Sequence, residues 1–102
     1  MAKFVIVYRD GATADMPGAV EASMTAWMNW FGTLGSAVTD FGNPFSSSTR
    51  VDADGSRTDS AAGLTGYSII EAESLDAAAA AVANCPNLAA GGSLEIYEAI
   101  PL

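Results

Sequence analysis

The stretch Phe4-Val5-Ile6-Val7-Tyr8 consists only of β-branched and aromatic side chains, which favour an extended strand. In a strand, its first, third and fifth side chains point to one face, and Val5 and Val7 point to the other. Both faces are therefore apolar, which is typical of a central strand that is covered on both sides. Other parts of this chain, or a partner, must therefore pack against each of the two faces of this strand.

The chain that follows alternates between helical and extended patterns. Helices are indicated where apolar side chains recur at spacings of three and four, and strands where short β-branched or aromatic runs stand between turn signals. The expected elements are a helix over 17–38 with Asp15 as its cap, a strand over 46–51, a strand over 67–72, a helix that starts after Ser74 and ends by Cys85, and a strand over 93–100.

Glycine residues mark the less regular parts of this pattern. The long helix contains Gly32 and Gly35, each of which is about 1 kcal/mol less favourable than Ala inside a helix. They indicate either close packing of the helix backbone or early fraying of its end. The polar loop 52–63 contains Asp54-Gly55, a pair that favours a hairpin turn.

The order of elements predicts the fold class. Strand, helix, strand, strand, helix, strand is the ferredoxin-like βαββαβ pattern, an α+β fold with a four-stranded antiparallel sheet and both helices on one face. In this arrangement the first and third strands are central, and these are the two most hydrophobic strands of the chain. Residues 1–102 are therefore expected to form a single ferredoxin-like domain.

The sheet face without helices predicts a partner. It would expose apolar side chains from two central strands, which is unusual for a small monomer. Only 16% of the residues are charged, whereas a small monomer usually covers its large relative surface with charge. We therefore expect a homodimer in which two copies pack sheet to sheet.

Composition excludes whole classes of function. Twelve Asp and Glu against four Lys and Arg give a net charge of −8, which disfavours binding to nucleic acid and to anionic membranes. No histidine is present, and Cys85 is the single cysteine, so neither an intrachain disulfide nor a zinc site of several Cys and His residues can form. No apolar run approaches the roughly 20 residues that span a bilayer. A cytoplasmic protein without metal or cofactor is the expectation.

A set of short motifs occurs in a family-like order along the chain. Each motif alone is weak evidence for a family, but the order of all of them along the chain is more specific. The motifs are Phe4 to Tyr8, Ala26-Trp27-Met28-Asn29-Trp30-Phe31, Leu34-Gly35, Gly42-Asn43-Pro44-Phe45, Leu64 to Ala72, Ser74-Leu75-Asp76-Ala77-Ala78, Cys85-Pro86 and Gly91 to Ile96. Together they resemble the YCII-related (YciI-like) domain family, including its DGPF-type branch.

This resemblance implies a dimeric α+β barrel built from ferredoxin-like protomers, in agreement with the hydrophobic pattern. Most members of the family have no assigned reaction, and some carry a His–Asp pair that is proposed to be catalytic. This chain has no histidine, so that chemistry cannot be transferred to it. The Asp-Gly-Pro-Phe motif is also missing, since Gly42-Asn43-Pro44-Phe45 is only similar to it and lies earlier in the chain.

Six residues are candidates for a ligand site between the long helix and the sheet: Arg9, Trp27, Trp30, Asp40, Asn43 and Tyr67. Aromatic rings suit an apolar pocket, an arginine suits a carboxylate, and an asparagine in a Gly-Asn-Pro turn can hydrogen-bond a ligand carbonyl or oxyanion.

Structural roles compete with ligand binding at these positions. Trp27 and Trp30 also fit the core side of an amphipathic helix. Asn43 also fits an Asx turn, and Arg9 fits an ion pair with Asp10 or Asp40.

Two other features are better explained by structure than by function. The alternation from Asp52 to Ser56 is not followed by the spacing of a calcium loop, which has Gly at its sixth position and Glu at its twelfth, so a solvated loop is expected there. Cys85 precedes Pro86 at the end of a helix, where a buried and inert thiol is expected.

Two functions from different classes follow. The first is a homodimeric small-molecule binding or accessory protein with a cleft for a small apolar or aromatic ligand and no chemistry. The second is a cofactor-free enzyme on a small aromatic or keto-acid substrate, with Arg9 holding a carboxylate, Asp40 as base, and Asn43 and Tyr67 orienting the substrate. A buried, unpaired Asp10 or Asp40 beside Trp30 would favour the enzyme, and exposed or Arg9-paired carboxylates would favour binding or a purely structural role.

Overall fold

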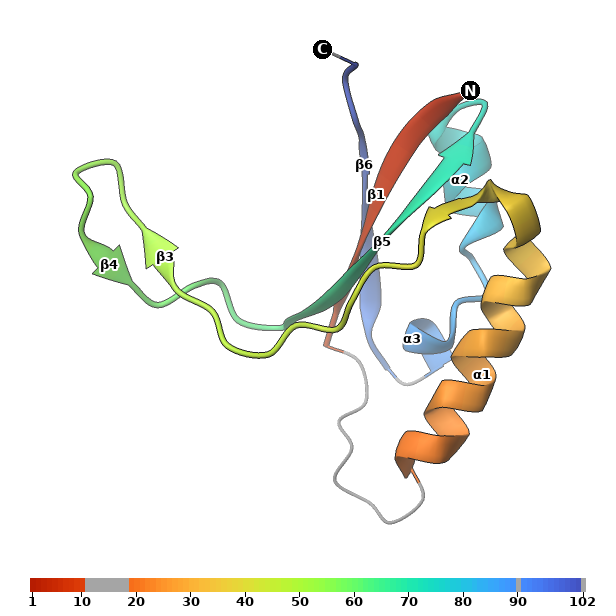
Figure 1. The fold of residues 1–102 in the computed structure, drawn as a ribbon, viewed down its shortest axis with the longest axis horizontal. Helices are drawn as coiled ribbons and strands as arrows, with labels where there is room; N and C mark the ends of the chain where they lie inside the picture. The colour runs from red at the N-terminus through yellow and green to blue at the C-terminus, as the bar shows by residue number, and fades with distance from the viewer. Residues whose placement is uncertain (11–18, 90, 102) are drawn as a thin grey trace.

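The computed structural model describes residues 1–10, 19–89 and 91–101, which form a twisted antiparallel sheet with helices on one face (Figure 1). A short 3₁₀ turn, Gly35–Ala37, follows the first helix. The elements in chain order are β1 (Ala2–Arg9), α1 (Ala19–Leu34), β2 (Val38–Asp40), β3 (Arg50–Val51), β4 (Arg57–Thr58), β5 (Leu64–Ala72), α2 (Leu75–Ala81), α3 (Pro86–Ala89) and β6 (Ser93–Glu98).

The main sheet has the strand order β2-β5-β1-β6, with every neighbouring pair antiparallel. Its first and third strands, β1 and β5, are central, which confirms the predicted ferredoxin-like α+β fold. Val7 of β1 lies opposite Tyr67 of β5 on one side and opposite Glu95 of β6 on the other. Strands from the two ends of the chain are therefore direct neighbours in the sheet.

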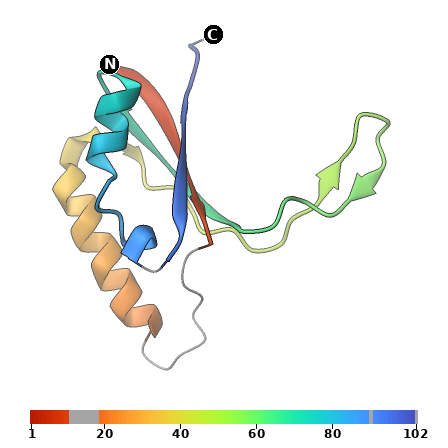
Figure 2. The same ribbon diagram turned by 180° about the vertical axis from the view of Figure 1, so that it is seen from behind.

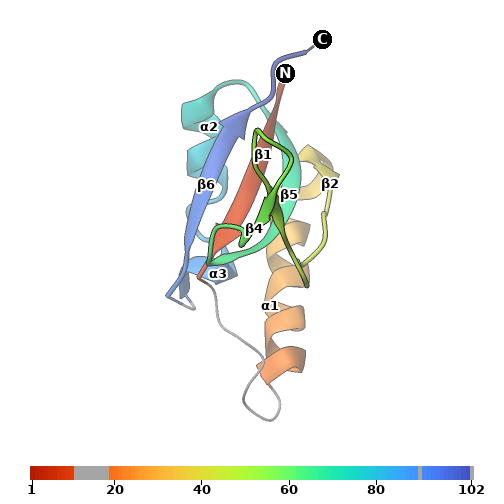
Figure 3. The same ribbon diagram turned by 90° about the vertical axis from the view of Figure 1, so that its left-hand side faces the viewer.

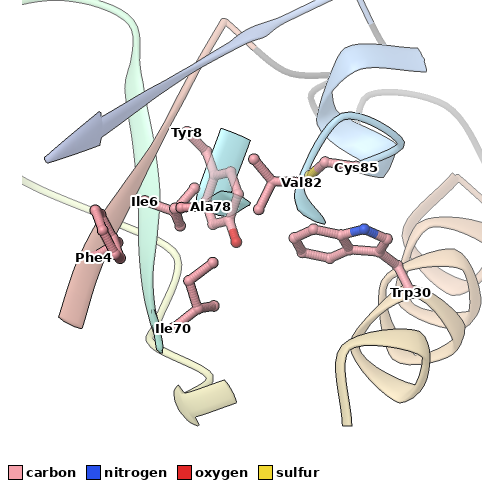
Figure 4. Packing of buried hydrophobic residues seen from close by; sticks show 8 residues of the cluster. All are labelled: Phe4, Ile6, Tyr8, Trp30, Ile70, Ala78, Val82 and Cys85. Carbon is pink, nitrogen blue, oxygen red and sulfur yellow. The ribbon is translucent and has the colours of Figure 1, made fainter. Parts of the chain in front are cut away.

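Alternation along β1 separates the two sheet faces as predicted. Phe4, Ile6 and Tyr8 are buried beneath the helices, whereas Val5 and Val7 are half-buried on the other side. The view from behind shows that all the helices lie on one face of the main sheet (Figure 2). The buried core comprises Phe4, Ile6, Tyr8, Trp30, Ile70, Ala78, Val82 and Cys85 (Figure 4).

The second strand of the main sheet lies elsewhere than expected. Helix α1 ends at Leu34 because Gly35 adopts φ +59°, so termination of the helix explains Gly35. Among the described residues, no atom lies within 4 Å of a Cβ built at Gly32 or Gly35, so close packing of the helix backbone explains neither glycine. Because the helix ends at Leu34, the residues that follow it can extend, and β2 pairs with β5. The strand predicted over 46–51 was wrong, because this serine-rich segment has little apolar surface to bury in the sheet.

Part of that segment instead forms a hairpin with the loop that follows it. Arg50 pairs with Thr58 and Val51 with Arg57, which confirms the hairpin turn predicted at Asp54-Gly55. We call residues 46–62 the arm. It projects from the sheet on the side opposite the helices (Figures 1 and 3).

The helices also differ from the expected pattern in detail. Ser74 caps α2 as predicted, since its Oγ accepts the backbone N–H of Ala77 at 3.1 Å. The expected cap at Asp15 lies outside the described residues. Within the segment predicted as the long helix, Met24 and Met28 are exposed, and the apolar side chains that pack toward the core are Trp27, Trp30, Phe31, Leu34 and Val38. Helix α3 replaces an expected loop, and no helix in the described part of the chain is long and apolar enough to cross a membrane.

Candidate ligand site

The candidate site residues do not converge on one cleft. Trp27 and Trp30 lie on the helix-covered face of the sheet, and Tyr67 lies beside Val7 on the opposite face. That opposite face, which we call the open face, consists of the alternate side chains of the three long strands. Its apolar members are Val5, Val7, Tyr67, Ile69 and Tyr97.

Both tryptophans belong to the packed interior of the helix face. Trp30 is 5% exposed, and its indole N–H donates a hydrogen bond to Asn84 Oδ1 at 3.0 Å. Trp27 is half-buried and stands edge-on to Tyr8, with 4.7 Å between ring centroids. The structure therefore places these rings where the core interpretation requires them.

Arg9 forms an ion pair with an acidic residue of β6. Its Nη1 lies 3.2 Å from Glu95 Oε2, so the expected pair with Asp10 or Asp40 was wrong. The reason is register, because β6 lies next to β1 and presents Glu95 on the same open face. Arg9 Nη2 also donates to the carbonyl of Ala62, at the end of the arm, at 3.5 Å.

Asp40 and Asn43 shape the turn that leads into the arm. The Asx-type hydrogen bond expected of Asn43 is made by Asp40, whose Oδ1 accepts the backbone N–H of Gly42 at 2.8 Å. The carbonyl of Asn43 accepts the N–H of Tyr67 at 3.3 Å. Asp40 and Asp10 are both exposed. Of the two outcomes set out above, this arrangement favours binding over general-base catalysis.

Tyr67 is the sequence-predicted residue with the clearest ligand geometry. Its ring stacks on that of Phe45, with 5.9 Å between centroids and 21° between planes. Phe45 is 46% exposed, and its backbone N–H is fixed by the carbonyl of Thr65 at 2.8 Å. We call Phe45 and Tyr67 the aromatic shelf.

A hollow of about 410 Å³ adjoins the shelf at the root of the arm. Its apolar walls suit a ring, and its serine hydroxyls offer hydrogen bonds to polar ring substituents. The hollow is lined by Pro44, Phe45, Ser46, Ser47, Ser48, Ser60, Ala61 and Leu64.

Sequence reasoning missed three residues that shape this region: Phe45, Glu95 and Asn87. Pairing the first and last strands would have indicated Glu95, because this pairing puts Glu95 opposite Val7 and on the same face as Tyr67. Asn87 carried no such signal, because it lies in a segment expected to be a loop. It is 4% exposed, and its Nδ2 donates to the carbonyls of Arg9 at 3.0 Å and Ser93 at 2.8 Å.

Replacing Asn87 with Ala is expected to lower the free energy of unfolding by about 2–3 kcal/mol, because two carbonyls lose their shared partner. The end of β1, and with it Arg9, should then loosen from β6. Urea denaturation measures the loss, and Asn84→Ala, which removes one acceptor at an exposed position, should cost about 1 kcal/mol. Equal losses for the two variants would contradict the assignment of Asn87 as a clamp.

Residues that could hold a metal ion do not gather in the described part of the chain, where no group of three or more Cys, Asp or Glu side chains has suitable geometry. In the arm, Asp54 instead accepts hydrogen bonds from Ser56, and these lower the pKa of its carboxyl. Cys85 is buried as expected, and burial raises its pKa to about 11.

Comparison with known proteins places the chain in a family. The model of the YCII-related domain matches residues 1–102. Among solved structures, the chain is similar to 5-chloro-2-hydroxyhydroquinone dehydrochlorinase (TftG) from Burkholderia phenoliruptrix AC1100, solved in complex with 2,5-dihydroxybenzoquinone. The TM-score is 0.53, the sequence identity is 21%, and 90% of each chain is covered. No curated protein matches the sequence.

Proposed function

This chain belongs to the YCII-related domain family, and from that premise we propose that it is a homodimeric protein that binds a small aromatic molecule. The observation that carries the proposal is the aromatic shelf on the open apolar face of the sheet, the same face that carries Arg9. Aromatic rings of a ligand prefer offset or tilted contact with other rings, and such contacts contribute about 0.5–1.5 kcal/mol beyond burial.

The polar surroundings of the shelf define the chemical class of the ligand. Arg9 is half-exposed in its pair with Glu95, so its remaining guanidinium N–H groups can reach a carboxylate or phenolate. The serines of the hollow can accept or donate hydrogen bonds to hydroxyl or carbonyl substituents. A hydroxylated or carboxylated ring fits both features. TftG, the similar protein named above, was solved with a dihydroxylated quinone.

Binding is favoured over catalysis by the state of the carboxylates. A general base needs a carboxyl whose pKa is raised in an apolar pocket. Asp10 and Asp40 are exposed, and Glu95 is paired with Arg9. The alternative, a cofactor-free enzyme for a small aromatic or keto-acid substrate, would need a buried and unpaired carboxyl, and none of these three described carboxylates is both.

The open face supports the homodimer. Its centre is apolar, with Val5, Val7 and Ile69, while Arg9 and Glu95 lie toward one end. An apolar centre with charged groups at the margin is the usual anatomy of a protein interface. Packing two open faces together would place each shelf at the margin of the contact.

Titration with 2,5-dihydroxybenzoquinone, followed by NMR and calorimetry, tests ligand binding. Wild-type protein should bind the probe, and Phe45→Leu should weaken binding up to about tenfold by removing the upper ring of the shelf. Phe41→Leu is the matched control, because Phe41 is also exposed but packs edge-on against Phe31 instead. Failure of the wild type to bind, or equal loss in both variants, would contradict the proposal.

A further inference from the structure

The outer part of the arm, beyond the serines that line the hollow, has no role in the proposed function. Its root is tied to the sheet by the hydrogen bonds of Asn43 and Phe45 to β5. Beyond the root, β3 and β4 form a separate two-stranded sheet with no third strand. The arm stands in front of the open face when that face is viewed directly (Figure 3).

A hairpin of this kind needs a covering surface. Two antiparallel strands alone are at best marginally stable in water. The arm has internal bonds, in which Asp52 holds both Arg50, at 2.7 Å, and Thr58, at 3.1 Å. However, Val51 is 64% exposed and finds no apolar cover within the described residues.

The surface area of the molecule points to the same need. A compact monomer of 10.4 kDa exposes about 5,400 Å², whereas this chain exposes 6972 Å². The difference of about 1,600 Å² is about twice the roughly 800 Å² that each partner buries in a standard protein interface. The radius of gyration, 14.9 Å, likewise exceeds the roughly 12.8 Å of a compact chain of this length.

Charge favours a second copy of this chain as the covering surface. The arm holds two of the four basic residues, Arg50 and Arg57, together with three aspartates, while the rest of the chain has nine acidic residues and two basic ones. Arg50 is neutralised by Asp52. The guanidinium of Arg57 donates to Thr49 Oγ1 at 3.4 Å and has no ion pair within the described residues.

We infer that each arm clasps the second copy in the sheet-to-sheet dimer, lying along that copy's sheet margin with Arg57 against its acidic surface. This inference rests on the dimer of the proposed function. The second copy is the occupant because the arm starts at the edge of the face that the copy would cover and projects toward that side. Twofold symmetry makes the clasp reciprocal, so each shelf is enclosed between its own sheet and the partner.

Hydrogen exchange of wild-type protein tests the clasp without any substitution. At a concentration where light scattering gives a dimeric mass, amides of residues 46–62 should exchange at least about tenfold more slowly than after dilution to monomer. Protection that does not depend on concentration would overturn the inference, because the cover would then lie within one chain.

Two variants provide an independent test. Replacing residues 48–60 with Asn-Gly closes the hairpin at its root, and this should raise the dimer Kd at least about tenfold while circular dichroism and the melting curve of the body are kept. Arg57→Glu should weaken the dimer more than its matched control Arg50→Glu, since Arg50 is already paired. An unchanged dimer Kd in the shortened variant would overturn the clasp alone.

The two proposals fail in different ways. A wild-type protein that is monomeric up to hundreds of micromolar contradicts the sheet-to-sheet dimer of the proposed function, and the clasp with it. A wild-type dimer whose arm exchanges rapidly and can be shortened without effect leaves the dimer standing and rejects the clasp. Slower exchange in the dimer, with weaker dimers in the shortened variant, supports both.

Discussion

Gly42→Ala is expected to lower the free energy of unfolding by about 3–5 kcal/mol, a large share of the 5–15 kcal/mol that holds a typical domain. Gly42 has φ +76°, a conformation that residues with a Cβ rarely adopt. A Cβ at this position would lie 1.7 Å from the carbonyl oxygen of Tyr67, which is backbone and cannot swing away. The turn and β5 would have to separate.

Chemical denaturation of the two proteins measures this loss. Gly91→Ala is the matched control, because Gly91 has φ +90° but no atom within 4 Å of the added Cβ. It should lose only about 1 kcal/mol, the part that comes from the backbone conformation. Equal losses at both positions would show that the contact with Tyr67 does not restrict residue 42. Because Tyr67 forms the aromatic shelf, Gly42→Ala should also weaken binding of the aromatic probe.

Raising the pH from 8 to 12 is expected to remove up to about 5 kcal/mol of stability through two buried acids. Burial raises the pKa of Cys85 from 9.0 to about 11. Burial likewise raises the pKa of Tyr8 from 10.0 to about 12, although its hydrogen bond to Ser68 partly opposes this. Between its ordinary pKa and its raised pKa, each group is still neutral in the folded protein but already ionised in the unfolded chain.

The sign of the effect follows from this order. Ionisation of the unfolded chain begins near pH 9 for the thiol and near pH 10 for the phenol, and it draws the equilibrium toward unfolding. The contribution is complete below pH 9 and is lost as the pH rises through about 11 for Cys85 and 12 for Tyr8. Urea denaturation under reducing conditions at intervals from pH 8 to 11 should show the decline.

Variants that lack each acid separate the two contributions. Cys85→Ala should flatten the decline between pH 9 and 11, and Tyr8→Phe should flatten it above pH 10, although both lower stability at pH 7 by removing packed atoms. A decline with the same slope in all three proteins would show that neither buried group is responsible. The same burial predicts that Cys85 reacts slowly with thiol reagents until the protein unfolds.

The fold could be predicted from residues whose local pattern and tertiary environment agree. The apolar run from Phe4 to Tyr8 is a central strand because both of its faces are at least partly buried, and Ser74 begins a helix because its hydroxyl caps the first turn. β2 could not be predicted, since three residues carry little pattern and its pairing with β5 depends on where Gly35 ends the preceding helix.

The candidate site was harder to predict for a related reason. Residue types indicated one cleft between the long helix and the sheet, but Arg9 and Tyr67 lie on the open face, and Trp27 and Trp30 lie across the sheet from them. Which residues share a face depends on strand register, and register is set by contacts between segments far apart in the sequence. Glu95 became a partner of Arg9 only through the pairing of the first and last strands.

That pairing also determines when the protein can fold during synthesis. β1 is synthesised well before β6, yet the two strands pair from Phe4 opposite Glu98 onward. At about 5–20 residues per second, roughly 4–18 s pass between the synthesis of Arg9 and that of Glu98. Throughout that interval one apolar edge of β1 lacks its final neighbour and can pair with another chain. Crowded expression should therefore favour aggregation of the nascent protein, and slower production at lower temperature should favour soluble yield.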